Sequence, residues 1–233
     1  MRTRIGLLAL SILILTVVIL AQELKPGVAR WNIKVSVMSG AASKKPAPLT
    51  VKQFKELDAP AFDPKAFKTK RMRSAGATGL QEGDMVKVEH AWVQIVALEK
   101  NSEGVDGDYH IQINEDRTNR DECVIVEVPY EDFAPNATLA KKYGTVRSTI
   151  RDKFFAGKEP GSSAKGACLK HPVEVTLTGQ LFYDATHKPS ADKPGGGRGK
   201  GGCKQNAATI WEIHPVLTMT ITSKKGQAEV PCQ

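Results

Sequence analysis

Two segments far apart in the sequence carry the side chains best suited to chemistry: Asp106–Ile111 (D-G-D-Y-H-I) and Trp211–Val216 (W-E-I-H-P-V). Each combines acidic side chains, one histidine and apolar residues typical of strands. A barrel that brings them together creates either a polar site or a buried network whose polar groups satisfy one another. That choice separates an enzyme from a scaffold.

Imidazole and carboxylate groups are ligands for zinc, iron or manganese. The spacings of Asp184 with His187 and of Glu212 with His214 suit a shared site, since residues two apart on a strand point to one face. The candidate metal ligands are His110, Glu127, Asp184, His187, Glu212 and His214. A bound divalent ion, the one cofactor these residues suggest, would activate water in a nuclease- or phosphoesterase-like hydrolase. In the alternative interpretation they are structural, with His110 donating to Glu127 or a carbonyl and Glu212 paired with His214.

A glycine-rich loop between residues 188 and 207 is the second candidate site. It is not a phosphate-binding P-loop, because Pro194 stands where the first glycine is required and Gly201 replaces the Ser or Thr. Its five positive side chains favour an anionic ligand, unless the loop is only a solvated hairpin tip. These candidate contacts are Lys188, Lys193, Arg198, Lys200 and Lys204.

The N-terminus predicts export. Basic residues precede an uncharged, mostly apolar run from Ile5 to Leu20, and the small residue Ala21 follows it. The run is shorter than the roughly 20 residues that span a bilayer, so we expect a cleaved signal segment over 1–21 and a periplasmic or secreted protein. An uncleaved N-terminal anchor is the alternative.

Four cysteines follow the signal segment, and an even number in an exported chain predicts two disulfides. Zinc coordination by cysteine does not fit, because no two of them have the short C-x-x-C type spacing. The sequence leaves all three pairings of Cys123, Cys168, Cys203 and Cys232 open.

The order of expected elements predicts the fold. Alternation predicts an N-terminal extension strand over 31–38, and Thr50 begins a short helix over 50–57. Strands are expected over 85–98, with a bend at Glu89–His90, and over 109–113, 123–128, 173–183 and 209–222, with a helix over 138–155. Three strands, a helix and two strands are the order of an OB-fold, a five-stranded Greek-key barrel.

The mature chain then divides into an N-terminal strand and surface-wrapping extension (22–82), an OB-like barrel (83–224) and a C-terminal tail (225–233). Arg2 and Arg4 leave with the signal, so the formal net charge falls from +8 to +6. An excess of this size favours either solubility or anionic partners.

The chain also resembles a family of uncharacterised secreted bacterial proteins. The shared motifs are R-W-x-[VI]-K at 30–34, D-G-D-x-H-[LI] at 106–111, E-[IV]-P at 127–129, F-[FY]-D-x-x-H at 182–187 and E-[LI]-H-P-V at 212–216. The resemblance implies an OB-like or nuclease-like barrel of unassigned activity. This chain departs from the family's compact loop at 188–207, so a property of that loop would be its own.

Together these observations predict an exported, non-catalytic binding or scaffold module of the cell envelope or extracellular space. Its expected partner is an anionic polymer or an envelope protein. The metal-dependent hydrolase is the alternative.

Overall fold

The computed structural model describes residues 30–58, 71–72, 78–99, 107–162, 168–184, 207–223 and 229–230. The predicted signal segment and several candidate residues lie outside these ranges: His187, Lys188, Lys193, Arg198, Lys200, Lys204, Cys203 and Cys232. None of the helices in the described part is long and apolar enough to cross a membrane.

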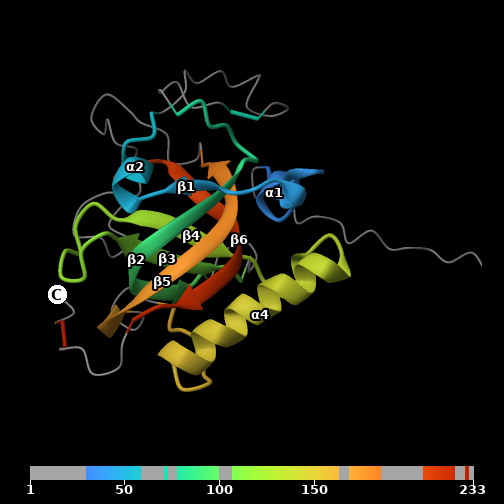
Figure 1. The fold of residues 1–233 in the computed structure, drawn as a ribbon. Coiled ribbons are helices and arrows are strands. Elements are labelled where there is room, and N and C mark those ends of the chain that lie inside the picture. Colours follow the sequence, from blue (N-terminus) through green and yellow to red (C-terminus); the bar gives the residue numbers. More distant parts are fainter. Residues whose placement is uncertain are drawn as a thin grey trace, which may run out of the picture.

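Five strands close into a barrel, so the prediction of a mainly β, OB-like barrel with one substantial helix is confirmed (Figure 1). The strand order is β2-β3-β4-β6-β5, and β5 pairs back with β2. All pairs are antiparallel except β4 with β6. The strands are β2 (Met85–Leu98), β3 (Tyr109–Asn114), β4 (Val124–Val128), β5 (Cys168–Tyr183) and β6 (Trp211–Ile221).

The first barrel strand, β2, bends where the sequence predicted. Its pairing with β5 shifts register between Val88 and Ala91, and His90 between them has a positive φ of 55°. A bulge of this kind increases the local twist of a strand. The bend lets β2 pair with β5 along most of its length and with β3 over its second half.

The helix α4 (Ala137–Phe154) connects β4 to β5 and packs against β6 (Figure 1). Asn136 caps its start, since its side chain accepts a hydrogen bond from the Leu139 N–H at 3.0 Å. Its predicted apolar stripe is buried at Leu139, Tyr143, Val146 and Ile150. Packing of this stripe holds the helix despite Gly144 in its interior.

The prediction of an extension strand over 31–38 is wrong. Residues 31–34 form the one-turn helix α1 (Trp31–Lys34), in which the Lys34 N–H donates to the Arg30 carbonyl at 3.0 Å. Arg30 and Lys34 form ion pairs with carboxylates of the barrel region. These two ion pairs favour the helical turn over the strand that the apolar alternation predicts. The extension instead contributes β1 (Ala47–Leu49), which pairs in parallel with Val86–Val88 of β2.

The short helix α2 (Val51–Lys55) forms where Thr50 predicted it. Gln53 N–H donates to the Thr50 hydroxyl at 3.1 Å, and Thr50 N–H donates to the Gln53 side chain at 2.9 Å, a capping box. Phe54 of this helix is fully buried in the main hydrophobic core. The extension therefore completes the barrel core and does not merely cover its surface.

Two residues of the predicted surface wrap over 58–82 are also buried, Met72 and Glu82. Two further short 3₁₀ turns complete the described elements, η1 (Ala41–Ser43) and η2 (Glu131–Phe133).

The tyrosines provide a test of this packing. Burial raises the pKa of Tyr109 and of Tyr183 to about 12 and raises the pKa of Tyr143, while the charge of Asp132 raises that of Tyr130. A tyrosine whose pKa is higher in the folded than in the unfolded state contributes stability at pH values below its unfolded pKa of about 10. This contribution is lost as the pH rises through the folded pKa of about 12. We expect tyrosinate absorbance to develop at higher pH in the native protein than in urea. Native tyrosines that titrate together near pH 10 would contradict the packing.

Candidate functional site

The two segments that open the sequence analysis meet on the barrel wall. His214 on β6 places its Nε2 atom 3.0 Å from Oδ2 of Asp108, which immediately precedes β3. Its Nδ1 atom lies 2.6 Å from the Lys34 carbonyl of α1. Both ring nitrogens therefore face oxygen atoms.

Glu127 of β4 links an inner and an outer group. Its Oε2 atom lies 3.3 Å from His214 Nε2 and 3.2 Å from Lys34 Nζ. Its Oε1 atom lies 2.9 Å from His110 Nδ1. Strand register fixes these positions: His110 pairs directly with Glu127, and the parallel β4–β6 register places Val126 beside Ile213.

The inner group, which we call the inner cluster, consists of Lys34, Asp108, Glu127 and His214. The Lys34 amine lies 3.1 Å from Asp108 Oδ2 as well as 3.2 Å from Glu127. Within this cluster two carboxylates share the Lys34 ammonium and the His214 ring. Ligand atoms of Asp108, Glu127 and His214 lie within 4.8 Å of one another, but the ammonium already neutralises this group.

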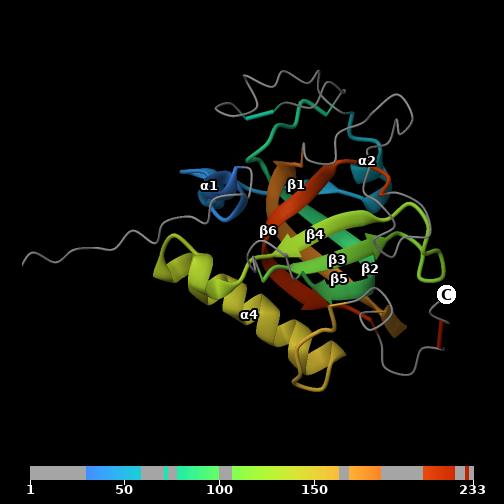
Figure 2. The ribbon, with the colours of Figure 1, turned by 180° about the vertical axis from the view of Figure 1, so that it is seen from behind.

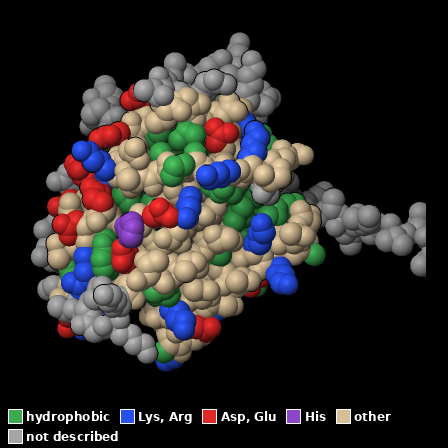
Figure 3. Space-filling model, in the orientation of Figure 1, with side chains coloured by type: hydrophobic (Ala, Val, Ile, Leu, Met, Phe, Trp, Pro, Cys, Tyr) green, Lys and Arg blue, Asp and Glu red, His purple; other side chains and the backbone are tan. Residues whose placement is uncertain are grey.

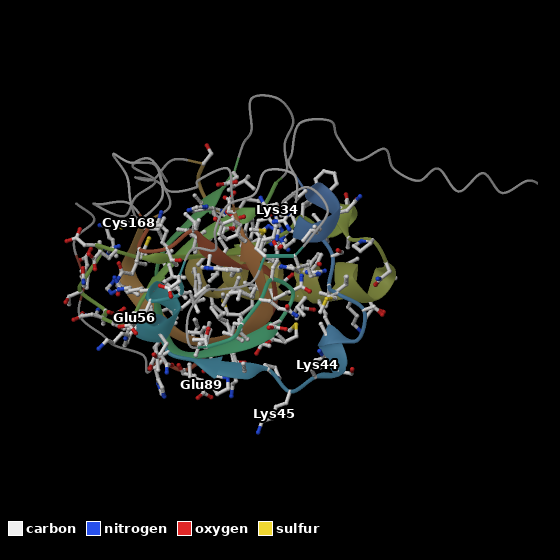
Figure 4. All side chains as sticks on the ribbon, turned by 90° about the horizontal axis from the view of Figure 1, so that it is seen from above. Lys34, Lys44, Lys45, Glu56, Glu89 and Cys168 are labelled. Carbon is white, nitrogen blue, oxygen red and sulfur yellow. The ribbon has the colours of Figure 1, made fainter. Side chains whose placement is uncertain are left out.

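Solvent has almost no access to the inner cluster. The side chains of Asp108 and His214 are fully buried, and Glu127 is nearly so. Lys34 is 12% exposed, and Figure 4 shows it above the barrel strands, while Lys45 projects outward from the same extension. Nearby, burial and then the charge of Asp108 raise the pKa of Tyr143.

The outer group, which we call the rim group, consists of Glu99, His110 and Glu127. His110 Nδ1 lies 3.1 Å from Glu99 Oε1 and 2.9 Å from Glu127 Oε1. Glu99 is 39% exposed and His110 is 12% exposed. The rim group is thus the part of this network that solvent reaches.

The other predicted ligands are elsewhere. Glu212 is buried on β6, between Ile125 of β4 and Phe182 of β5, and is in neither potential metal-binding group of the described residues. Asp184 follows β5, where its N–H donates to the Ile210 carbonyl at 3.1 Å. His187 and the five basic loop residues lie outside the described ranges. The structure therefore brings His110 and His214 to the same carboxylate, that of Glu127.

The outer face of β3 and β4 corresponds to the face that OB barrels use for oligonucleotides and oligosaccharides. Tyr109, Ile111 and Ile113 enter the core, so the alternate residues of β3 lie on this outer face. In this protein the N-terminal extension contacts that outer face. Lys55 of α2 donates to Asn114 at 2.9 Å, and Lys34 of α1 forms an ion pair with Glu127. Figure 2 views β3 and β4 with α1 and α2 on either side. The chain's own N-terminal region thus occupies part of the usual ligand face.

Three members of the network were not predicted as ligands. Lys34 lies in the predicted extension strand over 31–38, and Asp108 lies in the motif at 106–111 without being a predicted ligand. Glu99 had no motif, although its position directly after β2 brings it beside β3: its N–H donates to the Asp108 carbonyl at 2.9 Å. Only this antiparallel pairing reveals its proximity to His110.

The chain matches no protein-family model, no curated protein and no solved structure. The resemblance to secreted bacterial proteins therefore stays a prediction. The fold assignment rests on the strand order and the closure of the barrel.

Proposed function

We propose that this chain is an exported, non-catalytic binding or scaffold module of the cell envelope or the extracellular space. The observation that carries this proposal is the closed inner cluster. The Lys34 amine and the His214 ring each contact both carboxylates, and the side chains of Asp108, Glu127 and His214 are at most 2% exposed, which limits the approach of a substrate. A hydrolytic site needs a reachable ion or nucleophile, whereas a structural network needs complete pairing.

An anionic polymer is the partner we propose, with an envelope protein as the other class. Support comes from two observations. Five positive charges lie within residues 188–204. The chain's own Lys34 and Lys55 already contact part of the face that OB barrels use for ligands. On the face drawn in Figure 3, acidic side chains gather toward the left and basic ones toward the right, so neither sign covers it. The glycine-rich loop carries five positive charges opposed within it only by Asp192.

Neutralising Lys188, Lys193, Arg198, Lys200 and Lys204 to glutamine is expected to abolish salt-sensitive binding to a DNA duplex used as a test polyanion. Each phosphate contact contributes a slope of about −0.9 in a plot of log K against log salt, so five contacts give about −4.5. Fluorescence anisotropy over a salt series measures this slope. The matched control replaces five exposed lysines of equal total charge, Lys44, Lys45, Lys52, Lys141 and Lys153. Equal losses in both variants, or binding insensitive to salt, would reject the loop as the contact.

A metal-dependent hydrolase is the second candidate, favoured by the convergence of Asp108, Glu127 and His214 within 4.8 Å. It requires an ion to displace the Lys34 amine from between the two carboxylates. Metal-dependent phosphodiesterase activity that His214→Gln removes without lowering the melting temperature would favour it over the scaffold.

We also propose the disulfides Cys168–Cys232 and Cys123–Cys203. The Val230 N–H donates to the Lys170 carbonyl at 2.7 Å, and each of these residues is two positions in sequence from one cysteine, Cys232 and Cys168 respectively. The Ala208 N–H donates to the Cys123 carbonyl at 3.0 Å, close in sequence to Cys203. Neither described cysteine is a free thiol. Peptide mapping without reduction is expected to recover these two pairs; a Cys123–Cys168 or Cys123–Cys232 peptide would contradict the assignment.

A further inference from the structure

We propose that the rim group, Glu99, His110 and Glu127, is a binding site for one divalent transition-metal ion, with zinc as the best fit. The inference is independent of whether the protein is a catalyst. Its basis is the convergence of one imidazole nitrogen and two carboxylate oxygens, a ligand set that suits zinc.

The geometry is close to that of a coordination sphere. In a tetrahedral zinc site with bonds of about 2.0–2.1 Å, neighbouring ligand atoms lie about 3.3 Å apart. His110 Nδ1 lies 2.9 Å from Glu127 Oε1 and 3.1 Å from Glu99 Oε1. Each carboxylate oxygen therefore lies within a few tenths of an ångström of its expected distance from Nδ1, and the two carboxylate oxygens lie within 4.8 Å of each other. On binding, the ion replaces the proton on Nδ1, which passes to solvent, and the imidazole keeps its proton on Nε2.

Rigid elements hold two of the three ligands. His110 and Glu127 are direct cross-strand partners on β3 and β4. The second oxygen of Glu127 is held by Lys34 and His214 at 3.2 and 3.3 Å, so its first oxygen points to the rim. Partners of this kind orient a ligand and strengthen metal sites. The inner cluster thus has a role at this site: it positions Glu127.

Access and charge favour the rim group over the inner cluster. The inner cluster already contains the Lys34 ammonium between its two carboxylates. In the rim group, Glu99 is the second carboxylate and is 39% exposed, so an ion can enter and water can complete the coordination. We therefore place the ion at Nδ1 of His110 and not beside His214.

Isothermal titration of the purified protein with zinc tests the proposal. We expect one ion per chain at this site, with affinity lowered about 10-fold or more in Glu99→Gln and in His110→Gln. The matched control is His90→Gln, because His90 lies 2.7 Å from Glu174 but is 81% exposed and has no third ligand among the described residues. This variant should bind zinc as the original protein does.

A second readout locates the ion. Nitrogen NMR of the histidine rings is expected to show a zinc-dependent shift at His110 Nδ1 and little change at His214. If His110→Gln does not fold, Glu99→Gln decides, since the Glu99 side chain is largely outside the core. Failure to bind zinc below about 100 μM would overturn the proposal. So would unchanged binding in both rim variants, or a loss confined to His90→Gln.

Discussion

Replacing Glu82 by glutamine is expected to lower the free energy of unfolding by about 3–5 kcal/mol, the usual result of removing one partner of a buried ion pair. Glu82 is fully buried, and Arg30 beside it is 3% exposed. Arg30 donates to both carboxylate oxygens, to Oε1 at 2.7 Å. The Tyr183 and Met72 N–H groups also donate to this carboxylate, at 3.1 and 3.2 Å.

A second guanidinium, that of Arg71, increases the expected loss of stability. Burial lowers the pKa of Arg71, the charge of Glu82 raises it, and the charge of Arg30 lowers it. Neutralising Glu82 therefore leaves two neighbouring cations without the carboxylate they share. Urea denaturation followed by circular dichroism measures the change.

The control for this substitution is Glu89→Gln. Glu89 also forms an ion pair, with Lys87, but both side chains are largely exposed, at 52% and 43%. Water and salt screen such a pair, so we expect no resolvable change in stability. Equal effects of the two substitutions would mean that Glu82 is not a buried anchor.

Replacing Lys34 by methionine is expected to destabilise the protein by a similar amount, about 3–5 kcal/mol. The amine is the cation shared by Asp108 and Glu127, whose side chains are 0% and 2% exposed. Methionine keeps much of the apolar stem but removes the charge, so two buried carboxylates lose the ammonium that they share. Thermal and urea unfolding measure the loss.

Lys44→Met is the matched control, because Lys44 belongs to the same extension and is exposed (Figure 4). We expect it to leave the unfolding midpoint unchanged. A destabilised Lys34→Met protein would support the structural interpretation of the inner cluster. Full stability in this variant, joined with lost activity toward any substrate, would favour the hydrolase.

The barrel was predictable because its signals are local. The apolar stripe of α4, the cap at Thr50 and the change of pattern at Glu89–His90 each need only a few neighbouring residues. Their order then limits the topology to a few possibilities. The extension was not predictable in this way. The alternation from Trp31 indicates a strand, yet ion pairs with residues far along the chain select a helix.

The candidate site was predictable only by residue type. Histidine and carboxylate motifs identified His110, Glu127 and His214, and the barrel brings them together. The partners that define their chemistry come from positions without a motif: Lys34 occupies the inner cluster, and Glu99 completes the rim group. Tertiary register, which one sequence does not reveal, decides both contacts.

The long reach of the extension has a consequence for the order of folding. Lys34 accepts its bond from His214 across a sequence separation of 180 residues, and Trp211 donates to the Asp58 carbonyl across 153. Contacts with such separation carry a larger loop-closure cost than local ones and slow folding. Within residues 30–58, β1 can pair with β2 as soon as that strand forms, because the two are close in sequence. The contacts of Lys34 and Asp58 with β6 need the last barrel strand, so we expect them to form after the β1–β2 pairing.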